Sequence, residues 1–371
     1  MNVLVLVPYL YDTAPGQRFR IEPWARYLER QGFRFTFVPF EDEALHRVFY
    51  RAGQHGRKTI LMIKALIRRW RLLTRVHRYD VVFLHREAAL LGPAILERWI
   101  VRRGVPLVYD FDDPLWIPYR SPTHGWLSRL KCLGKVASIC RLATSVIVGN
   151  RRLEDYARQY TDRVYVVPST IDFERYPVKP LSNTSLVTLG WTGSHSTLPF
   201  LRQIEGPLRR LQESLPFRLL VIADREPSGL DGLPVVFHSW RSATEALDLH
   251  AMDIGLAPFP EGGWNPWRCH GKILQYMAVG IPPVASPVGI IPTDYIRDGV
   301  NGFLARTEDE WVEKLSLLIR DPDLRHRLGR AARQTVEENF SAARWALRVG
   351  DILREAVEAR YPSPTRKSGA S

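Results

Sequence analysis

The chain has 371 residues, 45% of them hydrophobic and 25% charged, which is enough for two domains and is not typical of disorder. The formal net charge is +13, and the excess lies in residues 1–173, which hold 28 Lys and Arg against 16 Asp and Glu. This cationic half predicts an anionic partner. No apolar run reaches the roughly 20 residues that span a bilayer, and Cys132, Cys140 and Cys269 fit neither a disulfide framework nor a zinc motif. We therefore expect a cytoplasmic chain whose first residues are a buried strand.

The N-terminal half begins with a pattern typical of a β-α-β unit. Val3–Val7 predicts a parallel strand, and a helix from Ile21 to Gln31 and a second strand from Phe33 to Val38 follow. The loop after the first strand carries Gly16, Arg18 and Arg20 but no complete Gly-x-Gly-x-x-Gly, so a dinucleotide fingerprint is absent. The two arginines favour an anionic ligand, with a solvated first helical turn as the alternative.

A strongly basic stretch runs from Arg47 to Arg78. Its arginines and lysines alternate with isoleucines, leucines and Trp70, a pattern that predicts an amphipathic helix. Two interpretations remain open: a surface helix without a partner, or adsorption to anionic lipid at about 1 kcal/mol per basic residue. Nucleic acid is not favoured as the partner, because no nucleic-acid-binding module is visible.

Ionisable residues follow the next two predicted strands. Asp80–Leu84 leads to His85 and Arg86, and Val105–Tyr109 leads to three aspartates, Asp110, Asp112 and Asp113, whose charges repel one another unless cations or hydrogen-bond donors offset them. Open α/β sheets bind ligands at the carboxyl ends of their strands, although helix capping and a turn at Pro114 are a structural alternative. No further residues complete a metal-ligand set.

The remaining elements alternate in the same way. A glycine loop with Gly193, Ser194 and His195 follows the strand that opens at Val187, and its backbone amides suit a diphosphate. Trp240, after another strand, is more typical of a core residue than of a base-stacking one. The predicted elements are helices Trp126–Leu142, Asp309–Arg320, Pro322–Asn339 and Ala342–Ala359, strands Ser145–Gly149, Val164–Pro168, Phe217–Ala223 and Val235–Ser239, a linker Tyr176–Thr184 and a disordered tail Ser363–Ser371.

The most informative stretch runs from Glu261 to Gly289. A loop rich in glycine and proline changes into a helix, Lys272–Val279, which ends at Gly280 and leads to a strand, Pro283–Ser286. A lysine in the first turn of a helix is suited to phosphate oxygens. The alternative is an ordinary helix-to-strand connection with a solvated lysine.

The run from Gly271 to Gly289 resembles the donor-site motif of the family 4 nucleotide-sugar glycosyltransferases, which have the GT-B fold. Asp253–Pro258 before it and Val300–Leu304 after it stand in the expected order. The resemblance implies an α/β chain with two Rossmann-like domains facing a cleft. Residues 1–173 would be the acceptor-side domain and 174–341 the nucleotide-sugar domain. Residues 342–371 would be a helix crossing back to the first domain, with a polar tail.

The resemblance also implies glycosyl transfer with retention of anomeric configuration, without a metal or another cofactor. We expect Lys272 to offset charge on the departing diphosphate and Gln275 to hold the ribose. The catalytic candidates are Asp112, Asp113 and Lys272; the donor-binding ones are Gly16, Gly193, Ser194, His195, Trp240, Arg268, Lys272 and Gln275; and the acceptor-side ones are Arg18, Arg20, His85 and Arg86.

The chain departs from the family at two glutamates that many members carry eight positions apart. Gln275 takes the place of the second and Trp267 the place of the first. Gln275 can still hydrogen-bond a ribose diol as a neutral partner, whereas Trp267 cannot replace a carboxylate. A bacterial subgroup that the chain resembles shares the glutamine, and Glu261 is a candidate for the missing acid.

Two other functions fit the same fold. A nucleotide-sugar epimerase would use the donor without an acceptor, and a non-catalytic scaffold at a membrane would explain why both motif glutamates are missing. We favour the transferase, with a lipid-linked or cell-surface glycan precursor as acceptor and peripheral attachment to the inner face of the plasma membrane through Arg47–Arg78. The donor nucleotide and sugar cannot be read from the shared motif.

Overall fold

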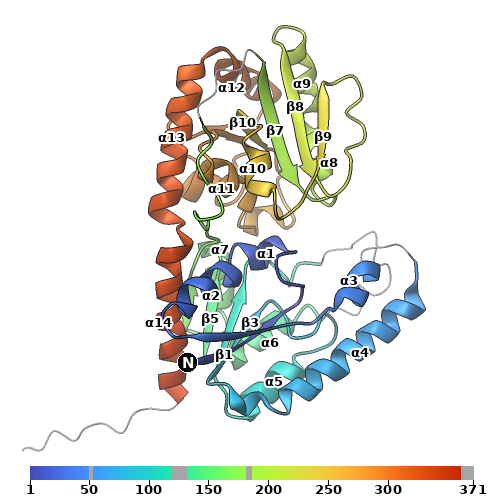
Figure 1. Cartoon of the computed structure of the whole chain (residues 1–371), viewed down its shortest axis with the longest axis vertical. Helices are drawn as coiled ribbons and strands as arrows, with labels where there is room; N and C mark the ends of the chain where they lie inside the picture. Colours follow the sequence, from blue (N-terminus) through green and yellow to red (C-terminus); the bar gives the residue numbers. More distant parts are fainter. Residues whose placement is uncertain (50–52, 119–131, 181–185, 361–371) are drawn as a thin grey trace, which may run out of the picture. The chain divides into compact units, whose positions relative to one another are not determined.

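The computed structural model describes residues 1–49, 53–118, 132–180 and 186–360. The chain divides into two compact units, each shown in Figure 1. Unit 1 is Met1–Ser169 together with the segment that begins at Ala343, and unit 2 is Thr170–Ala342. The predicted tail Ser363–Ser371, the start of the helix predicted at Trp126 and the end of the predicted linker lie outside the described residues.

Unit 1 is built on a parallel sheet of six strands within its described part, in the order β2-β1-β3-β4-β5-β6. Val3 to Val7 of β1 and all of β3 and β4 are buried, as expected for strands covered on both faces. The strands are β1 (Asn2–Val7), β2 (Arg34–Pro39), β3 (Val81–His85), β4 (Leu107–Phe111), β5 (Ser145–Val148) and β6 (Val164–Val166).

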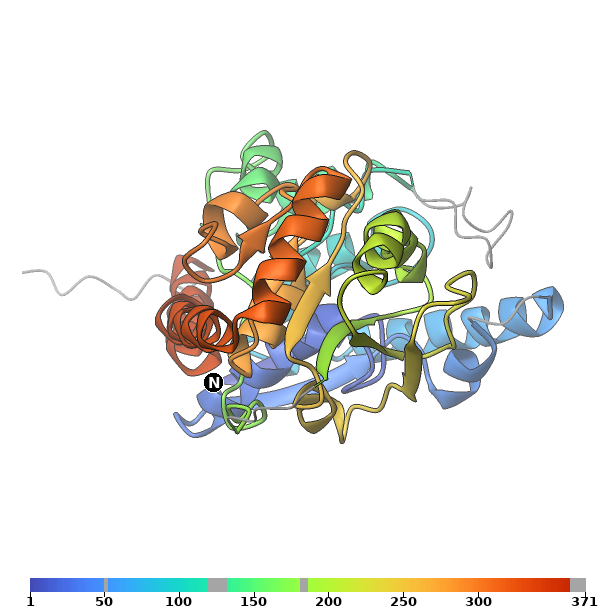
Figure 2. The same cartoon turned by 90° about the horizontal axis from the view of Figure 1, so that it is seen from above.

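Helices cover both faces of this sheet. The chain runs from β1 to β2 in one direction and from β2 to β3 in the other, and right-handed crossovers of opposite direction place helices on opposite faces. Neighbouring contacts join α3 to α4, α4 to α5 and α5 to α6 in one layer, and α3 lies beside α4 in both views (Figure 1, Figure 2). The helices are α1 (Pro15–Arg18), α2 (Ile21–Glu29), α3 (Glu43–Phe49), α4 (His55–Leu73), η1 (Val76–Arg78), α5 (Ile95–Arg102), α6 (Lys135–Leu142), α7 (Arg151–Ala157) and α14 (Ala342–Arg360).

Unit 2 repeats the plan with a second parallel sheet, again of six strands where it is described, in the order β12-β11-β10-β7-β8-β9. Its strands are β7 (Val187–Gly193), β8 (Phe217–Ala223), β9 (Val235–Ser239), β10 (Ile254–Ala257), β11 (Pro283–Ala285) and β12 (Phe303–Leu304). Its helices are α8 (Leu198–Leu201), η3 (Arg202–Ile204), α9 (Glu205–Gln212), α10 (Glu245–Leu249), η4 (Asn265–Trp267), α11 (Gly271–Ala278), η5 (Ile291–Tyr295), α12 (Glu308–Arg320) and α13 (Pro322–Asn339).

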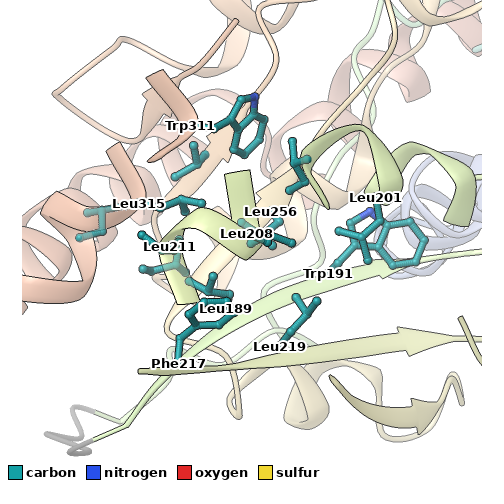
Figure 3. Packing of buried hydrophobic residues seen from close by; sticks show 14 of the residues in the cluster. Leu189, Trp191, Leu201, Leu208, Leu211, Phe217, Leu219, Leu256, Trp311 and Leu315 are labelled. Carbon is teal, nitrogen blue, oxygen red and sulfur yellow. The ribbon is translucent and has the colours of Figure 1, made fainter. Parts of the chain in front are cut away.

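The core of unit 2 lies between this sheet and α9 and α12. Leu189 and Trp191 of β7 pack there with Leu208 of α9 and Leu315 of α12. Figure 3 shows Trp191 next to Leu201, at the end of the cluster away from Phe217. Close packing of this kind holds β7 rigidly, which matters because β7 ends at the predicted glycine loop.

The predicted α/β class with two Rossmann-like domains is confirmed by these two sheets. The single helix predicted over Arg47–Arg78 is wrong: α3, α4 and η1 share that stretch. Gly53 and Gln54 have φ values of 75° and 54°, and left-handed backbone interrupts an α-helix. Within the described residues no helix is both long and apolar enough to cross a bilayer.

The described part of the predicted linker packs against unit 2. Tyr176 is buried, and its hydroxyl donates a hydrogen bond to Glu245 at 2.6 Å. Lys179 donates from its backbone N–H to the Val279 carbonyl and from Nζ to Asp253. Residues 176–180 are thus a docked part of unit 2.

Candidate functional site

Tyr276 fixes the position of α11 in unit 2. Its hydroxyl accepts a hydrogen bond from the backbone N–H of Thr192 at 2.9 Å and donates one to the carbonyl of Leu256 at 3.1 Å, which ties α11 to β7 and β10. Gly255 makes room for the ring, since a Cβ there would lie 2.4 Å from it. The first turn of α11 is therefore held close to the carboxyl ends of β7 and β10.

Three side chains with buried, unpartnered polar atoms lie at this first turn. Lys272 places Nζ 4.0 Å from the ring centroid of Trp191. Among the described residues, Lys272 Nζ, Trp191 Nε1 and both ring nitrogens of His270 have no hydrogen-bond partner. His270 precedes α11 with a left-handed backbone, φ 40°, and its ring packs against Phe259 with centroids 4.3 Å apart. An unpaired buried donor costs about 1–3 kcal/mol, so these atoms indicate a ligand that accepts hydrogen bonds.

The electrostatics of the cluster favour an anion. Burial, with a smaller contribution from Arg268, lowers the pKa of Lys272 well below its ordinary value. Burial, with Arg268 and Lys272 adding to it, lowers the pKa of His270 to about 3, so its ring is neutral near pH 7. The start of α11 adds backbone N–H groups and the positive end of a helix dipole. An anionic oxygen beside Lys272 would restore its positive charge, as a phosphate group does.

The glycine loop after β7 contains the predicted residues Gly193, Ser194 and His195. Asp224, just after β8, accepts a hydrogen bond from the backbone N–H of His195 at 2.5 Å, and its other oxygen lies 2.5 Å from His195 Nδ1. Ser194 Oγ lies 2.8 Å from Ser196 Oγ. Asp224 therefore holds the loop and orients the His195 ring, a role that the sequence did not reveal.

Substituting Gly193 by alanine is expected to destabilise unit 2. A Cβ at this position would lie 2.5 Å from Cη2 of Trp191 and 2.8 Å from Oγ1 of Thr197, and neither buried neighbour is free to move. We expect a loss of about 1–3 kcal/mol in the free energy of unfolding, measured by urea denaturation. Gly56→Ala in α4 is the control: no atom lies within 4 Å of its Cβ, so stability should stay equal or rise. A Gly193→Ala protein as stable as this control would show that a Cβ at this position does not collide with Trp191 and Thr197.

A chain of hydrogen bonds runs from Gln275 to Trp240. Nε2 of Gln275 donates to the Tyr176 hydroxyl at 3.3 Å, and that hydroxyl donates to Glu245. The other carboxylate oxygen of Glu245 accepts from Nε1 of Trp240 at 2.7 Å. The structure thus joins two predicted donor-binding residues through Tyr176 and Glu245, which the sequence analysis did not single out.

The motif loop also contains Trp267, Arg268 and Glu261. Trp267 ends the short helix η4, and Arg268 follows it with extended backbone. Glu261 is exposed and lies 3.4 Å from Arg306 in an ion pair, so it is not turned toward Lys272. The proposal of Glu261 as the missing acid has no support from this arrangement.

In unit 1 the predicted residues gather where β3 and β4 end. His85 is fully buried, and its Nδ1 lies 2.6 Å from Asp110 of β4. Arg20 is also fully buried; its guanidinium binds both oxygens of Asp110 and donates to the Val167 carbonyl at 2.7 Å. The pKa of Asp110 is lowered because Arg20 and His85 outweigh the effect of burial. Arg20 therefore holds the aspartate that orients His85, a role that the sequence did not reveal.

Arg86 draws the two predicted aspartates together. Its Nε donates to Asp112 at 2.8 Å and one of its terminal nitrogens to Asp113 at 2.6 Å. Burial alone would raise the pKa of Asp112, but Arg86, with His85 and Arg20, outweighs burial and lowers the pKa below its ordinary value. The carboxylate of Asp112 is thus ionised at neutral pH. Within the described ranges, no group of three or more His, Cys, Asp or Glu could hold a metal ion.

Gly16 brings its backbone against this group. A Cβ at Gly16 would lie 2.7 Å from Oδ2 of Asp112 and 3.1 Å from Nε2 of His85. That nitrogen is buried and has no hydrogen-bond partner in the part of the chain that the structure describes. Arg18 pairs with Asp12 at 2.9 Å and is buried, so its side chain is not solvated. Asp12 and Arg86 both have a φ of 61°, a strained backbone that is often found at functional sites.

Family models match both halves of the chain. Residues 16–175 match the model described as Glycosyltransferase Family 4, and residues 272–335 match the model described as Glycosyl transferases group 1. A trehalose synthase of Pyrococcus horikoshii is 33% identical over 81 residues, which are 22% of this chain and only 19% of that protein. The sulfoquinovosyl transferase SQD2 of Arabidopsis thaliana is 22% identical over 92% of this chain and 74% of its own.

Solved structures of similar fold cover nearly the whole chain. A sucrose-phosphate synthase of Thermosynechococcus elongatus has a TM-score of 0.67 at 14% identity, with 97% of this chain and 100% of that chain covered. The Anabaena protein Alr3699/HepE in complex with UDP-glucose has a TM-score of 0.65 at 18% identity, with 96% and 100% covered. These likenesses show the GT-B fold. Taken with the two family models, they show that the chain belongs to the group 1 glycosyltransferases of the family 4 type.

Proposed function

We propose that the chain transfers a sugar from a nucleoside-diphosphate sugar to an acceptor hydroxyl, with retention of anomeric configuration. The observation that carries the proposal is the cluster of unpartnered buried donors at Lys272, Trp191 and His270. A diphosphate has the charge and the acceptor oxygens to satisfy them, and the short helix start beside them suits the same group. Similar structures were solved with UDP, UDP-glucose and UDP-2-fluoroglucose, so UDP is the nucleotide we expect.

The reaction forms a bond between the acceptor oxygen and the anomeric carbon. The bond from that carbon to the diphosphate breaks, and its electron pair stays on the departing oxygen. Lys272 and the amides of Gly193 and Ser194 would offset this charge, with help from Arg268. Attack from the side of the leaving group retains configuration and sends the acceptor proton to the diphosphate. Gln275, supported by Tyr176 and Glu245, would bind the ribose.

The carboxylates of unit 1 serve the acceptor in this proposal. Asp112 and Asp113, both paired with Arg86, would accept hydrogen bonds from sugar hydroxyls in the way that carboxylates commonly do. His85, oriented by Asp110, has Nε2 available beside Gly16 for a hydroxyl or a phosphate oxygen. A lipid-linked glycan precursor fits the basic first half, and we propose that an anionic membrane surface presents it.

Calorimetric titration of the purified protein with UDP, GDP and ADP tests the donor site. Micromolar binding of UDP, with much weaker binding of the other two, is the expected result. Absence of binding by all three would contradict a donor site at Lys272 and favour a scaffold. Incubation with UDP-sugars without an acceptor then separates the transferase from an epimerase, because only an epimerase accumulates a second UDP-sugar.

A further inference from the structure

α4 presents a row of apolar side chains to solvent. Ile60, Ile63, Ile67 and Trp70 are 57%, 51%, 47% and 41% exposed, and their spacing places them along one side of the helix. Of the 14 exposed large hydrophobic residues in the described chain, six lie on α4 and α5, whereas the other eight are scattered. Isolated exposed leucines need no explanation, but a contiguous row does.

The row continues onto α5. The rings of Trp70 and Trp99 have centroids 5.1 Å apart. Ile95 is 59% exposed and lies one turn before Trp99 on the same side of its helix. We call Ile60, Ile63, Ile67, Trp70 and Ile95 the apolar stripe.

Buried residues on the opposite side of α4 anchor the helix, so that the stripe faces solvent. Arg69 is buried, and its guanidinium donates to the carbonyls of Val38 and Val7 at 3.0 and 3.1 Å, at the ends of β2 and β1. Met62, Ala65 and Leu73 are buried on the same side. The orientation of α4 is therefore fixed by its own anchoring and does not depend on what covers the stripe.

The charged side chains of α4 itself are all basic, and one of them, Arg68, pairs with Asp42 beside α3 at 2.7 Å. α4 contains no acidic residue, and Arg57, Lys64 and Arg71 form an exposed row along the side of the helix next to the stripe. The one acidic residue of α5, Glu97, is buried against Lys135. A second copy of the same surface would bring two cationic rows together, so self-association through it is disfavoured. The surface of an anionic lipid bilayer complements both features, because its phosphates can contact the cationic row and its acyl layer can take up the apolar stripe.

We propose that the apolar stripe inserts into the interfacial region of an anionic lipid bilayer while the row of Arg57, Lys64 and Arg71 contacts lipid phosphates. This deepens the membrane attachment in the proposed function and rests on it. Isoleucine and tryptophan side chains are suited to the boundary between headgroups and acyl chains. Because insertion is apolar, part of the binding is expected to survive high salt, which electrostatic adsorption alone would not.

Sedimentation with vesicles of phosphatidylglycerol and phosphatidylcholine, compared with phosphatidylcholine alone, tests the stripe. The Ile63→Ser/Ile67→Ser variant should partition at least about tenfold more weakly, since both isoleucines are exposed and their replacement leaves the fold intact. Arg57→Gln should weaken partitioning about fivefold and only with anionic vesicles. The matched control is Leu317→Ser/Leu347→Ser, which removes two equally exposed leucines elsewhere and should bind as wild type.

Vesicle binding by the serine variant equal to that of wild type would overturn the proposal, as would absence of binding by wild type. Gel filtration covers a further outcome: a wild-type oligomer that the same variant converts to a monomer would assign the stripe to a protein contact instead. UDP titration of each variant keeps the two proposals apart. A variant that binds UDP but not vesicles shows a defect in the stripe alone. A variant that binds vesicles but not UDP shows a defect in the donor site alone.

Discussion

Replacing Lys272 by methionine is expected to weaken UDP binding roughly a hundredfold, about 2.8 kcal/mol, while making the empty protein more stable. The amine is buried without a hydrogen-bond partner among the described residues, so the free protein bears a desolvation cost that methionine, of similar length, removes. We expect a gain of about 1–3 kcal/mol in the free energy of unfolding. Calorimetric titration and urea denaturation measure the two effects.

Lys314→Met is the matched control. This lysine also lies over an aromatic ring, 5.2 Å from the centroid of Phe303, but it is paired with Asp298 at 2.7 Å near the surface. Its replacement should leave UDP affinity unchanged and lower stability slightly. If Lys272→Met instead lowered stability without affecting UDP, Lys272 would be a structural residue.

The pH dependence of UDP affinity should reflect the titration of Lys272. The diphosphate binds the protonated amine, so affinity falls as pH rises above the lowered pKa of Lys272. Between that value and the ordinary pKa of lysine, the unfolded chain binds more protons than the folded one, so the empty protein becomes more stable with pH. Both trends should disappear in Lys272→Met, as titrations at several pH values would show.

Asp110→Ala is expected to lower the free energy of unfolding of unit 1 by about 3–5 kcal/mol. The substitution leaves the guanidinium of Arg20 buried and fully desolvated without its carboxylate, and it frees the ring of His85. Because the pKa of Asp110 is lowered in the folded state, the stabilisation is complete above the unfolded pKa and is lost as pH falls through the folded pKa. Hydrogen exchange of the β3 and β4 amides reports the change for unit 1 alone.

The exposed pair of Arg354 and Asp351 provides the comparison, since Asp351→Ala should cost less than about 1 kcal/mol. In Arg20→Met/Asp110→Ala the loss should be smaller than the sum of the two single losses, because the second change removes the unpaired charge left by the first. Additive losses would show that the two side chains do not stabilise one another.

The strands could be predicted closely because buried parallel strands have a continuous apolar pattern. β8 and β9 have the predicted bounds, and β1 and β11 differ by one residue at one end. The helix at Lys272 was also predicted, because Gly280, with a φ of 79°, ends it as its residue type suggests. The break between α3 and α4 was missed because periodic apolar and basic residues on both sides concealed the left-handed turn at Gly53.

Much of the candidate site depends on contacts that sequence distance conceals. Arg20 and Asp110 are 90 residues apart, and Tyr176 and Gln275 are 99 apart, so no local pattern could join them. One signal was available: Asp110 opens a run of three aspartates within four residues, which repel one another unless a cation or hydrogen-bond donors offset them. Asp224 and Glu245 had no comparable signal, because acidic residues after a strand or at the start of a helix are usually exposed.

Unit 1 is assembled from two segments with the whole of unit 2 between them. α14, from the second segment, approaches α2 closely at Gly350, places Arg354 over the ring of Phe33 and accepts a hydrogen bond from Tyr165 through Glu355. A ribosome therefore releases the complete chain of unit 2 before the helix that covers Leu28 and Phe33. During synthesis, the unit that begins to fold first is the one that is finished last.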